Sequence, residues 1–256
     1  MLAPIDIESL ERATLDAVAP PALEALPGWL LPFDATTIGR AKSAVPLGHQ
    51  RQDAAILSTI AARYAARGFP AVFRIADVPA LADLHAELTR LGFRAEQPTL
   101  VQVGTTKGTQ KVFLSSRAAS TQVTVSSKPT QAWSDVYLAP GFDPVDGAHR
   151  VQALSRSPHV IYATLSDEQG PAAAGTASFS QGWAGIHGMR TAVRCRGKGL
   201  AGQILLALAQ EALARGLDRM FLQVEEGNAA ALALYQRAGF TTAWRYHYWR
   251  ESYVSA

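Results

Sequence analysis

The sequence has little of three features that would point to a secreted or membrane-bound protein. Cys195 is the single cysteine, which excludes an internal disulfide and a cysteine-based metal cluster. No apolar run approaches the roughly 20 residues that a membrane helix needs. The N-terminus carries Asp6, Glu8 and Glu11 and lacks the basic start of a signal peptide. These absences predict a globular cytoplasmic protein with no membrane partner.

A large excess of either charge is also lacking. The 256 residues include 24 Lys or Arg and 21 Asp or Glu, which gives a formal net charge of +3. The balance holds in both halves, with 12 basic and 11 acidic residues up to residue 120 and 12 and 10 after it. The sequence pI of about 9.1 therefore reflects a small excess. Such an excess favours a local anion site over a wide nucleic-acid surface.

Hydrophobic spacing predicts a protein of mixed α and β structure in two parts. The first part should contain helices at 53–67 and 79–91 and strands at 71–75 and 99–103. Residues 104–120 are rich in Thr, Ser and Gly and mark the expected boundary, which gives domains of 1–120 and 121–256. The second part should run through these segments: a strand near 123–125, a helix or turn at 131–138, a short helix at 148–155, strands at 159–165, 172–180 and 185–193, a helix from 200 to near 216, a strand at 221–224, a helix at 229–238 and a strand at 246–249.

A basic, glycine-rich turn lies directly before the helix that is expected from Leu200. Gly197, Gly199 and Gly202 let a ligand approach the backbone, and the free N–H groups of a helix's first turn attract anions. Four cations lie within nine residues with no carboxylate among them: Arg190, Arg194, Arg196 and Lys198. The turn predicts a phosphate site. The alternative is an ordinary loop that enters a helix.

Two motifs in the second half resemble those of the GCN5-related N-acetyltransferase (GNAT) family. Arg196-Gly-Lys-Gly-Leu-Ala201 is similar to the family's pattern R/Q-x-x-G-x-G/A, with Arg194 to Gly199 as a second register. Asn228-Ala-Ala-Ala-Leu-Ala-Leu-Tyr-Gln-Arg-Ala-Gly-Phe240 is similar to N-x-x-A-x-x-L-Y-x-x-x-G-F. The resemblance covers about 121–250. It implies the GNAT acyl-CoA N-acyltransferase fold, an α+β fold with a mixed central sheet and helices on both faces.

The first half contains a short echo of the second motif. Leu88-Thr-Arg-Leu-Gly-Phe93 matches Tyr235-Gln-Arg-Ala-Gly-Phe240 at a constant offset of 147 residues, since 235 − 88 and 240 − 93 are equal. We interpret this echo as a degenerate first copy of the fold, which predicts tandem lobes. The first copy lacks the glycine loop and has Leu88 at the tyrosine position. Its expected role is to shape the substrate site of the second lobe.

The resemblance implies that acetyl-CoA is the co-substrate and that no metal is needed. The residues implied in binding coenzyme A are Val193, Arg194, Arg196, Gly197, Lys198, Gly199, Leu200, Ala201, Gly202 and Asn228. Asn228 is equally explained as a helix N-cap.

Tyr235 corresponds to the family residue that protonates the leaving thiolate, although core packing also explains it. The base that deprotonates the attacking amine is open between Glu225, His187 and water. Cys195 has no activating base in the sequence and is interpreted as structural.

The sequence therefore predicts an N-acetyltransferase that moves an acetyl group to a primary amine of a small molecule or peptide by direct attack in a ternary complex. The alternative is a catalytically silent acyl-CoA sensor or interaction protein. A homodimer is compatible with either function. A nucleic-acid patch around residue 194 is disfavoured because no aromatic residues are interleaved with its cations.

Overall fold

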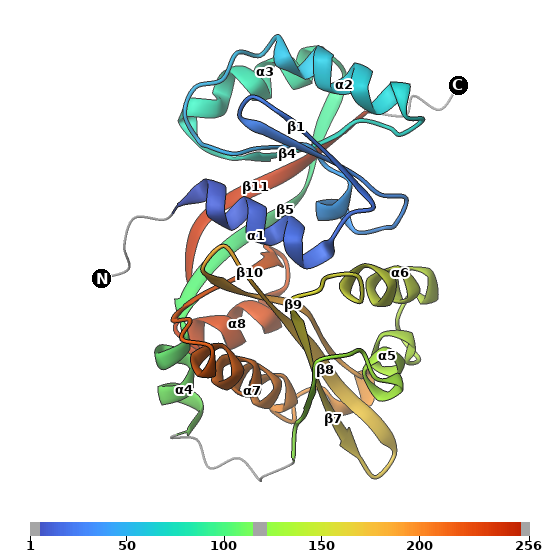
Figure 1. Cartoon of the computed structure of the whole chain (residues 1–256), viewed down its shortest axis with the longest axis vertical. Coiled ribbons are helices and arrows are strands. Elements are labelled where there is room, and N and C mark those ends of the chain that lie inside the picture. Colours follow the sequence, from blue (N-terminus) through green and yellow to red (C-terminus); the bar gives the residue numbers. More distant parts are fainter. Residues whose placement is uncertain (1–5, 115–121, 252–256) are drawn as a thin grey trace.

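The computed structural model describes residues 6–114 and 122–251, which form two lobes joined by shared strands (Figure 1). The boundary expected between residues 120 and 121 lies outside the described residues. The first lobe contains α1 (Ile7–Val18), β1 (Ala22–Leu26), β2 (Trp29–Phe33), the 3-10 helix η1 (Gly39–Ala41), β3 (Val45–Pro46), α2 (Ile56–Ala66), β4 (Val72–Ala76), η2 (Pro79–Leu81), α3 (Ala82–Arg90) and β5 (Phe93–Thr105).

The second lobe continues the chain from α4 onward. Its elements are α4 (Thr106–Leu114), β6 (Thr124–Ser126), α5 (Gln131–Leu138), α6 (Pro144–Leu154), β7 (Val160–Asp167), β8 (Gly170–Ser180), β9 (Trp183–Thr191), η3 (Val193–Cys195), α7 (Leu200–Ala214), β10 (Arg219–Glu225), α8 (Ala229–Arg237) and β11 (Thr241–Glu251). None of the helices in the described ranges has both the length and the apolarity needed to cross a membrane.

One eight-stranded sheet runs through both lobes in the order β4-β11-β5-β10-β9-β8-β7-β6. The strands β9 and β10 pair in parallel, and the other neighbours in this sheet are antiparallel. The sheet is therefore mixed, as predicted. The strands β1, β2 and β3 form a separate antiparallel sheet in the first lobe.

The long strands β5 and β11 hold the two lobes together. The β5 residues 99–105 pair with β10 of the second lobe, while β11 pairs with β5 along 93–103 and with β4 of the first lobe. Figure 1 shows these two strands side by side from one lobe into the other. Each follows a helix and a glycine with positive φ, Gly92 at 86° and Gly239 at 83°. This correspondence between α3–β5 and α8–β11 agrees with the echo in the sequence.

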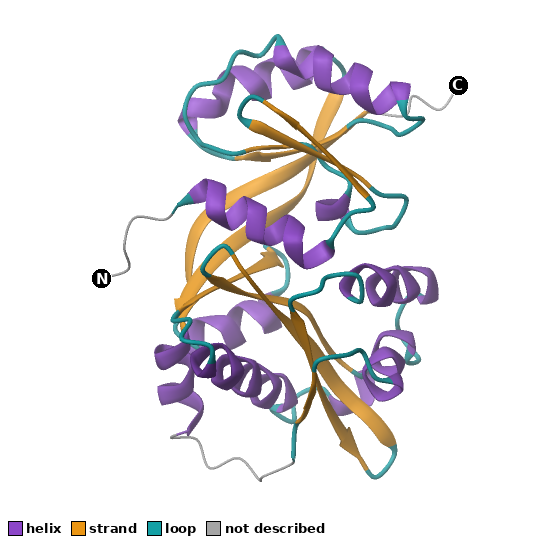
Figure 2. Ribbon diagram, viewed as in Figure 1, coloured by secondary structure: helices purple, strands orange, loops and turns teal. Residues whose placement is uncertain are grey.

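Helices cover both faces of the sheet, as predicted (Figure 2). On one face α7 packs against β7, β8 and β9 and also contacts α4. On the other face α1 contacts β8 and β9, and α5 contacts β7 and β8. The strand β10 alternates between the two sides: Phe221 belongs to the core of the first lobe, whereas Met220 and Leu222 belong to the core under α7 and α8.

The predicted elements are found, with ends that differ by a few residues. The segment at 131–138 is a helix, and the 148–155 helix begins earlier, because Asp143 caps α6 by accepting from the backbone N–H of Val145 and Asp146. Two parts were not predicted. Residues 7–46 form α1, three strands and η1, and the Thr-rich boundary zone begins with α4. The hydroxyl and backbone N–H of Thr106 fix the start of α4 by donating to the side chain and the carbonyl of Asp218, respectively.

Candidate functional site

The glycine-rich turn connects β9 and η3 to α7 and has a backbone that suits glycine. Gly197 and Gly199 both have φ of +77°, a left-handed conformation that other residues adopt at a cost. No atom lies within 4 Å of the position that a Cβ would take at either glycine. A ligand can therefore approach the backbone of the turn at these two glycines.

A run of backbone donors is free in this turn. The N–H groups of residues 197–201 have no acceptor within the described part of the chain, whereas those of Gly202 and Gln203 donate to the carbonyl of Gly199. Free N–H groups at the start of a 15-residue helix provide both hydrogen bonds and the positive end of the helix dipole. This part of the site fits the phosphates of a coenzyme A molecule.

The four cations of this region divide into two pairs. Arg190 reaches Asp146 of α6 at 3.1 Å, and Arg194 reaches Asp167 of β7 at 2.5 Å. The hydrogen bond from Arg194 lowers the pKa of Asp167 to about 2, so this carboxylate is ionised at neutral pH. Arg196 and Lys198 are exposed and have no carboxylate partner among the described residues. The cations left for an anion are therefore Arg196 and Lys198.

The parallel strands β9 and β10 separate after Ile186 and Leu222, before β9 reaches the glycine-rich turn. Their parallel pairing covers Ala184 to Ile186 of β9 and Met220 to Leu222 of β10 and then stops. Beyond this point β9 pairs with β8, through a bulge between Thr176 and Ala174, and β10 pairs with β5. The edges of β9 and β10 that face one another therefore leave backbone groups without a ladder partner.

Tyr235 lies on α8 against the core under α7. Its side chain is buried, and its ring lies 5.9 Å from that of Phe240. Burial raises the pKa of Tyr235 to about 12 because it disfavours the phenolate. The phenol is therefore protonated at neutral pH and has a proton to give.

Glu225 is the last residue of β10 and is exposed. Its Oε1 accepts a hydrogen bond of 2.7 Å from Nε2 of Gln97, a residue of β5. Gln97 has φ of 53°, one of three non-glycine residues with positive φ in the described ranges. A strained residue from the first lobe thus holds the candidate base of the second lobe.

His187 is fully enclosed. Its side chain lies edge-on to Phe221 at 5.5 Å, and neither ring nitrogen has a partner within the described residues. Burial, assisted by the charge of Arg40, lowers the pKa of His187 well below the usual 6.5. The ring is therefore neutral and shielded, which fits a base less well than the exposed Glu225.

Four further residues that the sequence singled out have these places in the structure. The side chain of Asn228 caps α8 by accepting from the N–H of Ala231 at 3.2 Å. Val193 is exposed in η3, and Leu200 begins α7. Cys195 is buried, with its thiol 3.3 Å from Asp167. Burial raises the pKa of this thiol, which agrees with a structural role.

A comparison with protein families matches residues 5–249 to the family described as "Probable histone acetyltransferase Rv0428c C-terminal". The chain belongs to this family. The family is of the GNAT acetyltransferase type, and the motif resemblance is confirmed.

Curated relatives support the same assignment over shorter stretches. An uncharacterized N-acetyltransferase, YobR of Bacillus subtilis, is 32% identical over 123 residues, which is 47% of this chain and 50% of YobR. An L-methionine sulfoximine/L-methionine sulfone acetyltransferase of Pseudomonas aeruginosa is 51% identical over 45 residues, which is 18% of this chain and 26% of that enzyme. The chain thus matches half or less of the length of these relatives.

Solved structures share the whole two-lobed fold. A GCN5-related N-acetyltransferase from Kribbella flavida has a TM-score of 0.70 at 15% identity, with 97% of this chain and 96% of that chain covered. A tandem GNAT protein from the clavulanic acid biosynthesis pathway has a TM-score of 0.63 at 12% identity, with the same coverage. These GNAT neighbours confirm the predicted fold class, tandem lobes included.

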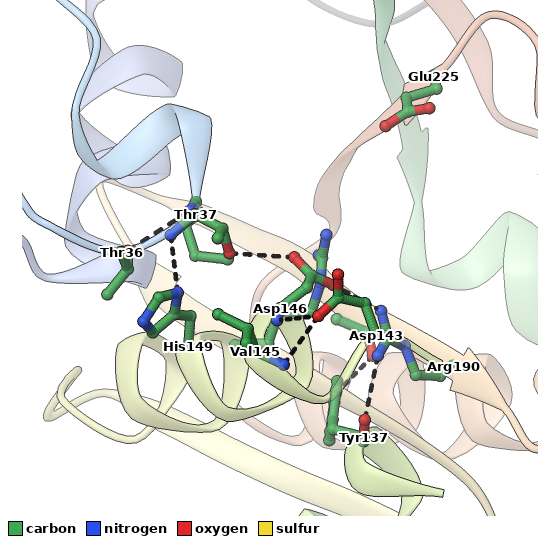
Figure 3. A network of polar contacts seen from close by, with 12 residues as sticks. Thr36, Thr37, Tyr137, Asp143, Val145, Asp146, His149, Arg190 and Glu225 are labelled. Carbon is green, nitrogen blue, oxygen red and sulfur yellow. Dashed lines mark hydrogen bonds and ion pairs between the residues drawn. The ribbon is translucent and has the colours of Figure 1, made fainter. Parts of the chain in front are cut away.

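The structure also shows a polar network between the two lobes that the sequence did not reveal. A polar network links Thr37 of the first lobe to Asp146, His149 and Arg190 of the second (Figure 3). The hydroxyl of Thr37 donates to Asp146 at 3.1 Å, and its N–H donates to Nδ1 of His149 at 3.1 Å. These partners are 109 and 112 residues apart in the chain, so no local pattern could have indicated them.

Proposed function

We propose that this protein transfers an acetyl group from acetyl-CoA to a primary amine of a small molecule or peptide, by direct attack in a ternary complex. The observation that carries the proposal is the row of free N–H groups at 197–201, next to two strands that separate. When bound, acetyl-CoA supplies the activated acetyl group. Residues 197–202, with Arg196 and Lys198, would hold its phosphates.

The separated strands support the second half of the proposal. Where two parallel strands separate, their unpaired backbone groups are available to bind a ligand. In this protein those groups belong to β9 after Ile186 and to β10 after Leu222. Free N–H groups of β9 near the bulge at Gly188 are suited to stabilising negative charge on the carbonyl oxygen under attack. Holding both substrates at this point supplies much of the rate, because a bimolecular reaction becomes effectively unimolecular.

The proton transfers are assigned to two side chains. The amine must lose a proton as its nitrogen forms the new C–N bond, and Glu225 accepts that proton directly or through a water. As the C–S bond breaks, the hydroxyl of Tyr235 gives its proton to the sulfur. His187 remains the second candidate for the base. Because its side chain is buried, its neutral ring could act only through a proton path that connects it to the amine.

Calorimetry with acetyl-CoA and free-thiol release with a panel of amines test the proposal together. Saturable binding of acetyl-CoA and amine-dependent thiol release are the expected results. Absence of both from the purified protein would contradict it. Binding without turnover on any amine would instead favour the alternative, a catalytically silent acyl-CoA sensor.

Three expectations from the sequence stay predictions: a homodimer, a domain division at residue 120 and a cytoplasmic location.

Gln97 provides a separate test of Glu225 as the base. Substitution Gln97→Gly removes the hydrogen bond to Glu225 and relieves the positive φ of 53°, so we expect the free energy of unfolding to stay within about 1 kcal/mol of the wild type. The kcat should fall roughly tenfold because a misplaced base works less well, with the KM for acetyl-CoA unchanged.

Gln181 offers a matched control for this substitution. It also has positive φ, at 52°, and its amide also donates to a carboxylate, Asp16 at 3.2 Å. Gln181 lies in the turn between β8 and β9, at the end of the sheet away from the glycine-rich turn. Gln181→Gly should leave kcat unchanged. An equal fall in kcat for both variants would mean that Gln97 acts through stability alone.

A further inference from the structure

The face of the sheet that meets the first lobe carries polar groups at the point where β9 and β10 separate. Phe221 and Trp183 on this face belong to the core of the first lobe. Because side chains alternate along a strand, Gln223 and Glu225 share the face of Phe221, two and four residues on. The amide of Gln223 donates to Thr14 of α1 at 3.1 Å. This face is therefore bounded by the first lobe.

Arg40 of η1 lies near this face of the sheet. Its neighbour Gly39 packs on the ring of Tyr248, since a Cβ at Gly39 would lie 2.6 Å from the ring's Cζ. The charge of Arg40 acts on His187 of β9 and on Tyr246 of β11, and the hydroxyl of Tyr246 is 3.5 Å from Gln223. Arg40 thus lies close to His187 of β9 and to Tyr246 of β11.

Arg40 lacks the partner that comparable arginines have. Arg74 is paired with Glu11, Arg156 with Asp34 and Arg190 with Asp146. No acceptor or carboxylate contacts Arg40 among the described residues, and its Nε is buried without a partner. A partly buried guanidinium without an anion is costly, so this position is suited to an anion from outside the chain.

The segment that carries Arg40 is fastened to the second lobe. Asp34 is paired with Arg156, and Thr37 is bonded to Asp146 and His149, as Figure 3 shows for Thr37. Three contacts within four residues fix the start of the turn that leads to η1. Arg40 is therefore held in place by contacts between its neighbours and the second lobe, and a binding group needs such support.

We propose that Arg40 binds a carboxylate of the acetyl acceptor, so that the acceptor is a small zwitterionic amine of the amino-acid type. This inference rests on the proposed function. Such a molecule needs two charges opposite its own: Arg40 would meet the carboxylate, and Glu225, which shares the face of Phe221, would meet the ammonium group before it loses its proton. Arg74, which lies over the ring of Tyr246, is already paired with Glu11, so Arg40 is the guanidinium left for a ligand here. One guanidinium suits a monoanion, whereas a phosphate dianion usually meets several cations.

The test compares amino acids with the amines that result from loss of their carboxylate. The pairs are L-methionine and 3-(methylthio)propylamine, L-phenylalanine and 2-phenylethylamine, and L-leucine and 3-methylbutylamine. Thiol release gives kcat/KM for each, and calorimetry on the CoA-bound protein gives binding without turnover. The wild type should prefer at least one amino acid over its matched amine by about 10- to 100-fold, the usual range for a charge-assisted hydrogen bond.

The variant Arg40→Met should abolish this preference, with little change for the amines and none in acetyl-CoA affinity. Arg51→Met is the control, since Arg51 belongs to the same lobe and pairs with Asp83 at the surface. Equal use of both members of every pair, a preference that survives Arg40→Met, or acetylation of a C-terminally amidated lysine peptide in preference to every amino acid would overturn the proposal. So would a failure of all three amino acids to bind or react.

The two proposals fail in different ways. If the wild type does not bind acetyl-CoA, the proposed function fails, while calorimetry with the amino acids on wild type and Arg40→Met still decides the role of Arg40. If acetyl-CoA binds and amines react without regard to a carboxylate, the proposed function stands and the inference about Arg40 is wrong.

Discussion

Gly199→Asp is expected to lower the affinity for acetyl-CoA by at least about 100-fold, because like charges brought together in a binding site cost several kcal/mol. Gly199 is the N-cap of α7, with φ of +77° and open space where a Cβ would go. A carboxylate there would occupy the space of the anion and accept hydrogen bonds from the free N–H groups of Leu200 and Ala201. Isothermal titration calorimetry measures the effect.

The other end of the same helix provides the control. Gly216 has φ of +73° and also has no atom within 4 Å of the Cβ position. Gly216→Asp thus adds the same charge at a similar backbone cost, beyond the last turn of α7. Gly216→Asp should lose at least as much thermal stability as Gly199→Asp, because a carboxylate is unfavourable at the C-terminal end of a helix, yet Gly199→Asp alone should lose binding. Equal loss of binding would mean that the turn acts through folding, and retained binding in Gly199→Asp would refute the phosphate site.

Local patterns were sufficient to predict the helices α7 and α8 and the turn before α7, which carry most residues of the candidate site. The apolar spacing after Leu200 predicts α7, and the glycines before it predict the open turn. Asn228 was predicted as a cap and accepts from Ala231 as a cap does. In each case the physical cause, a repeat of side chains or a backbone preference, is contained in the segment itself.

The remainder depends on residues that are distant in sequence. The segment from Arg190 to Lys198 contains no carboxylate, so the sequence suggested that all four of its cations were available to bind an anion. The fold brings Asp146 to Arg190 and Asp167 to Arg194 across 44 and 27 residues. Likewise, the pairing of β5 with β10 joins residues more than 100 positions apart, and the sequence of neither strand indicates which strand it pairs with.

The first 52 residues show most clearly what local reasoning lacks. Arg40 lies in a 3-10 helix of three residues with no periodic signal, and its place is fixed by the contacts of its neighbours Thr37 and Gly39 with α6 and β11. The expectation that the first lobe shapes the substrate site came from the echo at Gly92-Phe93. The residue proposed to do so could be found only from the structure.

Tyr235→Phe is expected to lower kcat by about 100-fold or more, the range for loss of a positioned general acid, and to leave the acetyl-CoA affinity unchanged. The substitution keeps the ring that packs against Phe240 and removes the hydroxyl alone. Because burial raises the pKa of Tyr235 to about 12, its proton is present throughout the range from pH 6 to pH 10. The wild-type kcat should therefore show no fall caused by this group below pH 10.

The control is Tyr64→Phe, which removes the hydroxyl of a buried tyrosine in the first lobe. That hydroxyl donates to the carbonyl of Pro32 at 2.9 Å, so its loss should cost about 1 kcal/mol of stability without lowering kcat. Stopped-flow thiol release at saturating acetyl-CoA separates the chemical step from product release. If Tyr235→Phe keeps the wild-type rate in that experiment, the leaving sulfur takes its proton from water, and Tyr235 serves the core under α7 alone.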